Sequence, residues 1–552
     1  MIVKKTSLIS ALKKLPLPAV IFFFCFLICG CGNRAESEKT ADAGTSVPTY
    51  GDAIVVASIA DARTLVPILA SDAASGQICS MVFNGLIKYD KDLKLIGDLA
   101  ENWDIMNGGL VIVFHLRKGV KWHDGVEFTA DDVEFSYHKL IDPKVPTPYS
   151  GDFQKVKSFE ILDKYTVKIT YAEPFSPALA SWGMNIMPKH LLEHEDLMRT
   201  KFSRHPVGTG PYKFREWKTQ EMIVLDSNHE YFEGRPYIDR YIYRIIPDST
   251  TMFLELQNLG VDWMGLSPLQ YRRQTDTVFF KDHFRKFRYN GFSFTYMGYN
   301  LKDPKFSDVR VRRAINYAVD KKDIIDGVLL GLGRECTGPF VRSSWAYNEK
   351  VKPVAVDLEK SKALLKEAGW NLNDKGLLEK NGNVFEFTII TNQGNEERKR
   401  AAEIIQKQLS RIGMRVKIKV IEWSAFINDF INKKNFEAVL LGWAMSNDPD
   451  IYDIWHSSKT KEGEFNFIGY KNEEVDKLLE AGRREFDVKI RKKYYNRIHE
   501  IIYDEQPYLF LYYPDSLPIV NSRFRGIEPA PAGISYNFIK WYVPAVEQRY
   551  AE

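Results

Sequence analysis

The chain has 552 residues, which is too long for a single hydrophobic core and predicts at least two large lobes. Apolar residues make up 45% of it and charged residues 27%, as is ordinary for a globular protein in water. The formal net charge is +4, but the first 30 residues hold four lysines and no acid, so the rest of the chain is neutral. This balance excludes a basic nucleic-acid-binding surface.

Residues 1–30 are typical of an export signal. A lysine-rich start is followed by an apolar run over residues 15–30, which is short for a membrane-spanning helix and begins with two prolines. The run ends in Ile28-Cys29-Gly30-Cys31, which resembles a bacterial lipobox. We therefore predict a signal peptide and lipid attachment at Cys31. A plain signal peptide and an uncleaved anchor are the alternatives.

Residues 31–49 contain one valine and no aromatic residue, and they predict a disordered tether. A flexible coil of this length spans roughly 20–25 Å on average. Beyond the tether only Cys79 and Cys336 remain. An oxidising compartment would allow them to pair, but two thiols so far apart in sequence are more typical of unpaired core residues.

From residue 52 onward, strands and helices mix without a detectable repeat. Alternating or continuous apolar runs predict strands at 53–58, 110–116, 165–171, 212–217, 222–225, 241–246, 296–301, 416–420 and 438–441. Helical spacing and capping residues predict helices at 78–87, from Thr129 to Leu140, at 249–260, from Asp308 onward and at 395–412. Because helices separate the strands between 390 and 441, we expect a parallel core there and an α/β fold.

The stretch 436–455 is the strongest candidate for a site. Residues 438–441 read as a strand buried on both faces, which stops at Gly442, where the chain can bend or approach another group closely. Ligands of open α/β sheets sit just past the carboxyl ends of strands. We therefore interpret the residues that follow as the wall of a crevice. They are Trp443, Ala444, Met445, Ser446 and Asp448. The alternative is a helix cap, with Ser446 or Asp448 capping toward Ile451.

Several blocks in order along the chain resemble the family 5 extracellular solute-binding proteins, the dipeptide and oligopeptide receptors of ATP-binding cassette importers. The likeness extends from about residue 52 to residue 545. The blocks are Leu99-Ala-Glu-Asn-Trp103, Phe114-His-Leu-Arg-Lys-Gly-Val-Lys-Trp-His-Asp-Gly125, Phe128-Thr-Ala-Asp-Asp-Val-Glu-Phe135, Pro206-Val-Gly-Thr-Gly-Pro-Tyr212, Asp308-Val-Arg-Val-Arg-Arg-Ala-Ile-Asn-Tyr-Ala-Val-Asp320 and Gly442-Trp443.

The resemblance implies a two-lobed periplasmic-binding-protein fold of the Venus-flytrap type. Lobe 1 would comprise residues 50–290 and 515–552, with an extra subdomain at 83–206, and lobe 2 residues 291–514. A peptide or similar small solute would be held between the lobes, and membrane permease subunits would read the closure. The expected protein is an exported, lipid-anchored monomer, in the periplasm or on the outer face of the cytoplasmic membrane, with no catalytic residue, metal or cofactor.

Peptide receptors of this family place an aspartate three residues after the tryptophan, where it pairs with the amino group of the peptide. That position is Ser446 here, and Asp448 or Asp450 are the candidate substitutes. The loop around Asn392 lacks the arginine that dipeptide receptors use for the carboxylate, while Arg398 and Arg400 lie a turn further on. Tyr149 matches a pocket tyrosine of oligopeptide receptors, its alternative being a surface aromatic residue.

Three rival interpretations remain. The string His190-Leu-Leu-Glu193-His194 is similar to a zinc-peptidase motif, with two histidine ligands and a glutamate base. The same fold could also serve a sensor, or a receptor for nickel complexes, haem or sugars. Finally, three acids of one loop could hold a cation, although helix-capping acids are the commoner case. These acids are Asp448, Asp450 and Asp453.

Overall fold

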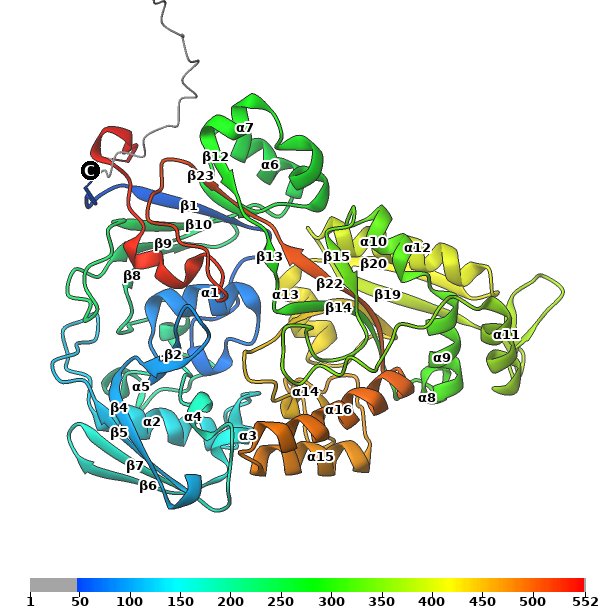
Figure 1. Ribbon diagram of the computed structural model, residues 1–552, viewed down its shortest axis with the longest axis horizontal. Coiled ribbons are helices and arrows are strands. Elements are labelled where there is room, and N and C mark those ends of the chain that lie inside the picture. The colour runs from blue at the N-terminus through cyan, green and yellow to red at the C-terminus, as the bar shows by residue number, and fades with distance from the viewer. Residues whose placement is uncertain (1–46, 551–552) are drawn as a thin grey trace, which may run out of the picture. The chain divides into compact units, whose positions relative to one another are not determined.

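The computed structural model describes residues 47–550, which form one compact unit. The predicted signal peptide at 1–30, Cys31 and most of the predicted tether lie outside the described residues. Two seven-stranded sheets organise the described chain, one in each lobe (Figure 1). We call the lobe that contains β1 the first lobe and the lobe that contains β21 the second.

The sheet of the first lobe has the order β12-β23-β11-β1-β10-β9-β8. Its central strand β1 is apolar and runs parallel to β10, whose side chains alternate between buried and half-buried. The predicted strands in this region are confirmed. The bounds are β1 Ala53–Ser58, β8 Tyr212–Lys218, β9 Met222–Ser227, β10 Arg240–Ile245, β11 Trp263–Gly265, β12 Phe284–Lys286 and β23 Pro518–Asn521.

A four-stranded antiparallel sheet of order β4-β5-β7-β6 extends the first lobe, and we call it, with α2, α3 and α4, the subdomain. Helix α2 begins with the predicted capping box between Thr129 and Asp132. The elements are α2 Ala130–Ile141, α3 Ser150–Phe153, α4 Ala178–Ser181, β4 Ala100–Met106, β5 Val111–Leu116, β6 Val156–Asp163 and β7 Thr166–Tyr171. A hairpin of β2 (Ile87–Tyr89) and β3 (Leu95–Gly97) lies beside them in the chain.

The helix predicted at 78–87 is wrong in its bounds. Helix α1 spans Ala73–Val82, because Asp72 caps it by accepting a hydrogen bond of 3.0 Å from the Ser75 amide. Phe83 then leaves the helix in an extended conformation, and Ile87, the last residue of the predicted segment, begins β2.

The sheet of the second lobe has the order β13-β22-β14-β21-β19-β20, with β15 paired to β22. Helix α12 (Glu396–Ser410) connects β19 to the parallel strand β20, which confirms the predicted parallel core. Gly413 follows the helix at φ 86°, a left-handed conformation that glycine adopts freely. The strands are β13 Tyr289–Asn290, β14 Ser293–Tyr299, β15 Gly333–Glu335, β19 Glu386–Asn392, β20 Arg415–Ile421, β21 Ala438–Ala444 and β22 Tyr508–Ser516.

Strand β21 is buried on both faces, as predicted. Ala438 and Leu440 pack into the cluster of α9 (Val309–Ala318) and α12, whereas Val439 and Leu441 pack into the cluster of α15 (Glu473–Arg484) and α16 (Val488–Glu505). The predicted end at Gly442 is wrong, because the next two residues continue the ladder to Phe294 and Ser293 of β14.

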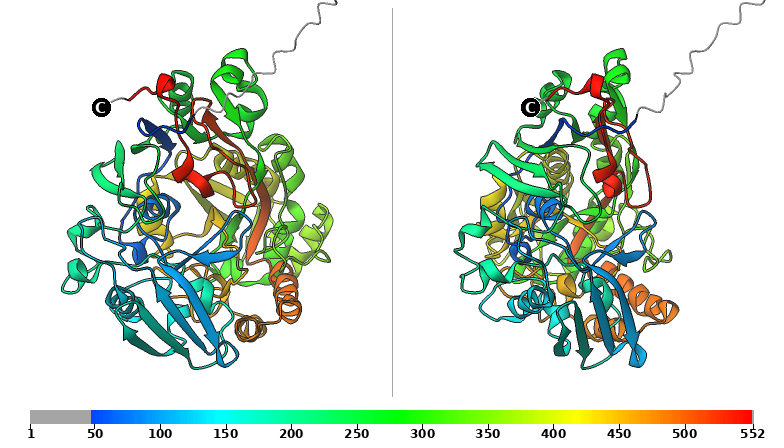
Figure 2. Two further views of the ribbon diagram at one scale, coloured as in Figure 1. Left: turned by 60° about the vertical axis from the view of Figure 1, so that its left-hand side comes forward. Right: turned by 90° about the vertical axis from the view of Figure 1, so that its left-hand side faces the viewer.

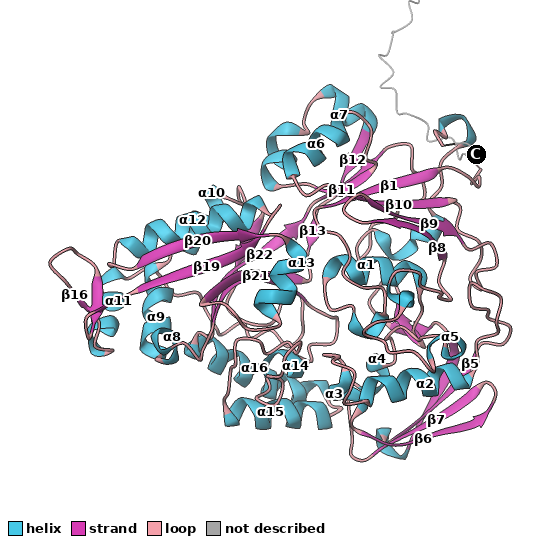
Figure 3. Ribbon diagram, turned by 180° about the vertical axis from the view of Figure 1, so that it is seen from behind, coloured by secondary structure: helices cyan, strands magenta, loops and turns pink. Residues whose placement is uncertain are grey.

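The two sheets are joined by strands. The chain crosses from β12 through β13 into β14, and it returns along β22 into β23 (Figure 3). The predicted lobe boundaries fall after β13 and within β22, and they stay a prediction.

The remaining helices are α5 Lys189–Leu192, α6 Ser249–Gln257, α7 Val278–His283, α8 Pro304–Ser307, α10 Lys321–Gly327, α11 Leu358–Glu367, α13 Trp423–Ala425 and α14 Tyr452–Trp455. None of the helices between residues 47 and 550 is long and apolar enough to cross a bilayer.

Candidate ligand-binding site

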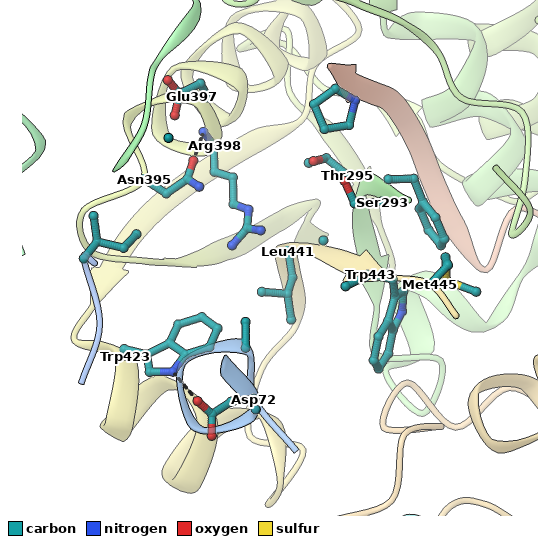
Figure 4. Close-up of a pocket in the computed structure, with 18 of the residues that line it drawn as sticks. Asp72, Ser293, Thr295, Asn395, Glu397, Arg398, Trp423, Leu441, Trp443 and Met445 are labelled. Atoms are coloured by element: carbon teal, nitrogen blue, oxygen red, sulfur yellow. Dashed lines mark hydrogen bonds between the residues drawn. The ribbon is translucent and has the colours of Figure 1, made fainter. Parts of the chain in front are cut away.

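A cavity of about 1240 Å³ lies between the lobes and is lined by both (Figure 4). The first lobe supplies the start of α1 around Asp72 and the loop after β11. The second lobe supplies the start of β14, the start of α12 and the end of β21. Trp423 of the second lobe reaches the first, and its indole Nε1 lies 3.5 Å from the Asp72 carboxylate there.

Trp443 forms an aromatic wall of this cavity. Its ring lies against Phe465 and Phe467, at centroid distances of 5.3 and 5.8 Å. The indole Nε1 donates to the hydroxyl of Tyr508 at 3.2 Å. Held on three sides, the ring presents a rigid apolar surface to the cavity.

Beside Trp443, β21 has one edge that no other described strand covers. Along its whole length β21 pairs with β14 on one side. On the other side β19 pairs only with Ala438 and Val439, at the start of the strand. Residues 441–444 line the cavity, so those of their backbone N–H and C=O groups that point away from β14 are open to a guest there.

Arg398 points into the cavity from the first turn of α12 (Figure 4). Its Nη1 donates to the side-chain oxygen of Asn392 at 2.8 Å, and it forms no ion pair with any described residue. Burial lowers the pKa of this guanidinium, which remains a cation near neutral pH. An added Cβ at Gly442 would lie 2.9 Å from Nη2, so the glycine allows the close approach that the sequence predicted.

The predicted residue Asn392 does not line the cavity. It is buried, and its side chain accepts the hydrogen bond from Arg398 and donates to the Gln393 carbonyl at 3.0 Å. It therefore lies behind Arg398 and orients it. Arg398 was not among the predicted site residues. The signal that would have found it is a basic residue in the first turn of a helix that follows a buried strand.

Trp443, Ala444, Met445, Ser446 and Asp448 all line the cavity, as does Tyr149. The Ser446 hydroxyl donates to the backbone carbonyl of Asp448 at 2.6 Å. The Tyr149 hydroxyl donates to the Ala70 carbonyl at 3.0 Å, and its ring meets Phe465 of the second lobe edge-on at 5.8 Å.

The helix-cap alternative for Ser446 and Asp448 is wrong. Helix α14 begins at Tyr452 and neither residue caps it, whereas Asp450 accepts from the Tyr452 amide at 3.2 Å. The cation-site alternative also fails, because each of the three acids already faces a cation of the chain. The pairs are Asp448 with Arg491 at 3.2 Å, Asp450 with Arg483 at 2.6 Å, and Asp453 with Lys459 at 3.0 Å.

The zinc-peptidase string does not form a site. Helix α5 ends at Leu192, so the two histidines do not share a helical face. His190 Nε2 lies 2.8 Å from the Asp124 carboxylate, and the His194 side chain is 93% exposed. Over residues 47–550 no three His, Cys, Asp or Glu side chains are arranged to hold a metal. Cys79 and Cys336 are both free and buried, as favoured from the sequence.

Two lobes with a cavity lined by both define a class of protein that encloses a guest between its halves. The model of the bacterial extracellular solute-binding proteins, family 5, matches residues 94–465, and the chain belongs to this family. The comparisons with solved structures confirm the predicted two-lobed α/β fold.

Three similar proteins illustrate the family. The oligopeptide-binding protein AppA of Bacillus subtilis (strain 168) is 35% identical, over 95% of this chain and 98% of its own length. Its structure with a nonapeptide has a TM-score of 0.86 and covers 90% of this chain and all of that one. DppA from Helicobacter pylori with peptide STSA is 30% identical at a TM-score of 0.81, covering 90% and 99%. NikZ from Campylobacter jejuni with Ni(L-His) is 30% identical at a TM-score of 0.80, covering 89% and 99%.

Proposed function

We propose that this protein is an exported, lipid-anchored receptor that captures peptides between its lobes and delivers them to the permease of an ATP-binding cassette importer. Cys31 carries the lipid, and Trp443, Ala444, Met445, Ser446, Asp448 and Tyr149 contact the guest, with Asn392 behind them. The receptor acts as a monomer on the outer face of the membrane or in the periplasm, and it performs no chemistry on its guest.

The observation that carries the peptide assignment is the open edge of β21 inside the cavity. An extended peptide can add to such an edge as a further strand, through hydrogen bonds that do not depend on its sequence. Trp443 then receives an apolar part of the peptide beside this edge. A sugar or a metal complex has no main chain that could match the spacing of the backbone groups of residues 441–444 that point away from β14.

The size of the cavity supports a guest of several residues. Sites for small molecules commonly enclose about 300–1,000 Å³. The cavity here, at about 1240 Å³, exceeds that range. AppA, whose structure holds a nonapeptide, is similar to this chain over nearly its whole length.

Arg398 adds a preference for an anionic group. Its guanidinium lacks an acidic partner in the described chain, and a carboxylate of the guest would supply one through charge-assisted hydrogen bonds. The Asp448 carboxylate is paired with Arg491, so the amino group of a peptide has no free acid at that position. We therefore assign the carboxylate, rather than the amino group, as the anchored charge.

The test combines mass spectrometry of material that co-purifies with the exported protein and calorimetric titration with peptide mixtures of about 2–10 residues. Peptides in the purified protein, and micromolar or tighter binding of the mixtures, are the expected results, corresponding to about −8 kcal/mol. Recovery of a nickel complex, haem or sugar, with no heat from any peptide mixture, would contradict the proposal.

The lipid anchor is tested separately. Cys31→Ser removes the acylated thiol, and we expect the variant to be found in the soluble extracytoplasmic fraction instead of the membrane fraction. Each buried methylene of an acyl chain contributes about 0.8 kcal/mol, so losing the chains abolishes stable anchoring. A variant that stays with the membrane would show that residues 1–30 act as an uncleaved anchor.

A further inference from the structure

The end of α15 docks the second lobe on the subdomain of the first. The Ser176 amide donates to the Arg483 carbonyl at 2.6 Å, and the Ser176 hydroxyl donates to the Gly482 carbonyl at 3.2 Å. Beside this contact Arg484 forms an ion pair of 2.6 Å with Glu173. Figures 1 and 2 show α15 next to the subdomain in each view. None of these contacts needs a guest in the cavity.

Arg483 bridges acids of both lobes at this junction. Its Nη2 lies 2.7 Å from the Asp152 carboxylate in α3 of the subdomain and 2.6 Å from the Asp450 carboxylate in the second lobe. The Arg483 side chain is only 4% exposed, and its guanidinium stacks on the ring of Tyr452, 3.9 Å from the centroid.

Closing the lobes brings several charges together. Asp152 shares the Arg483 guanidinium with Asp450 of the opposite lobe, and Asp453, paired with Lys459, lies against Gly151 next to Asp152. An added Cβ at Gly151 would lie 2.7 Å from Lys459 Nζ, so the two lobes are in close contact. Like charges this close oppose each other, and burial makes the repulsion stronger.

We propose that Arg483 is a positioning residue for closure. Its guanidinium neutralises the acids that meet when the lobes approach, and it lets them close even with the cavity empty. It touches no guest, and it raises affinity by populating the closed form, because a receptor binds with its intrinsic affinity only in the fraction of molecules that is competent. This inference does not depend on the identity of the guest.

The experiment is amide-resolved hydrogen exchange on the exported, ligand-free protein, read at Ser176, whose N–H is bonded across the lobes. Arg483→Met leaves Asp152 and Asp450 without their shared cation, and we expect protection at Ser176 to fall by about tenfold or more. Arg497→Met is the matched control, since Arg497 pairs with Glu474 at 2.8 Å within the second lobe, and it should leave Ser176 unchanged. The Ile169 amide, in the core of the subdomain, reports whether each variant is folded.

A second variant separates charge from shape. Adding Asp152→Asn to Arg483→Met removes one of the repelling acids, and we expect protection at Ser176 to recover by several-fold. If Arg483→Met lowered the protection of Ser176 only through lost packing, adding Asp152→Asn would not restore it. If Arg483→Met exposes Ile169 as well, the less disruptive Arg483→Lys replaces it, with a smaller loss expected at Ser176 alone.

The inference is overturned by an unprotected Ser176 amide in the wild-type protein, by unchanged protection in a folded Arg483 variant, or by a double variant no better protected than the single one. Because these measurements use no ligand, their outcome is independent of the peptide titrations that test the proposed function.

Discussion

Two arginines of the second lobe stand beside the same cavity in opposite states. Arg483 is held by carboxylates from both lobes, at 2.7 and 2.6 Å. Arg398 faces the cavity with only the amide oxygen of Asn392 as a partner. A half-buried cation without an acidic partner is costly, so a protein keeps one where something else supplies the charge. The comparison distinguishes two tasks. The charges that meet when the lobes close are paired within the chain, whereas the charge that faces a guest is left for the guest to pair.

The largest effect is expected when Arg398, which has no acidic partner, is replaced. Arg398→Met should weaken the binding of a peptide with a free carboxylate by about 10–100-fold, because a hydrogen bond to a charged group contributes about 1.5–3 kcal/mol. The same peptide with an amidated C-terminus should lose little. Calorimetry on both peptides measures the difference, and Arg411→Met, at the exposed far end of α12, is the control. Equal losses for the two peptides would show that Arg398 does not anchor the carboxylate.

Trp443→Ala should weaken binding of all peptides by several-fold or more, since the aromatic wall next to the open strand edge is lost. Trp443→Phe should recover part of that loss. Unlike the Arg398 variant, this one should not distinguish free from amidated termini. An unchanged affinity in Trp443→Ala would show that the guest does not bind beside β21.

The junction around Arg483 predicts a pH dependence. Burial raises the pKa of Asp152 from its ordinary 3.8 to about 6, Asp453 and Asp450 add to the shift, and Arg483 opposes it. Opening the lobes would expose Asp152 to water, and we expect its pKa to return toward the ordinary value of 3.8. The closed form therefore binds more protons between these values, and closure becomes more favourable as the pH falls through about 6.

We expect affinity to tighten by several-fold between pH 7 and pH 5, within a range where peptide carboxylates stay ionised. Asp152→Asn should remove most of this dependence while keeping its contact to Arg483. Titration calorimetry at the two pH values measures both, and affinity that weakens toward pH 5 in the wild type would have the wrong sign for this account.

The smallest effect tests how Arg398 is placed. Gly442→Ala puts a Cβ 2.9 Å from Arg398 Nη2 and 3.1 Å from the Phe294 carbonyl oxygen, so the guanidinium must move and the strand must give slightly. Because a long side chain can adjust, we expect only a few-fold loss, confined to peptides with a free carboxylate. A loss of the same size for amidated peptides would indicate that the strand itself had shifted.

Local patterns predicted much of the fold. The continuous apolar run at 438–441 identified a strand covered on both faces, and Thr129 with Asp132 identified the start of α2. The end of β21 was missed because it depends on pairing with Ser293, which is distant in the sequence. The start of α1 was missed because the apolar spacing begins later than the Asp72 cap.

The site was predictable in part. Ligands of such sheets bind at the carboxyl ends of strands, and the predicted residues at and just after the end of β21 do line the cavity. The unpaired state of Arg398 was not predictable, since it depends on which acids lie near it after folding. The same holds for Arg483, whose partner Asp152 is separated from it by most of the chain.

The most direct test is a crystal structure of the protein with the peptide that co-purifies or binds most tightly. We predict a peptide in the cavity between the lobes, with its main chain hydrogen-bonded along residues 441–444 of β21 and its carboxylate on Arg398. A guest confined to the neighbouring cavity lined by Leu95 and Trp345, with the edge of β21 left free, would contradict the account.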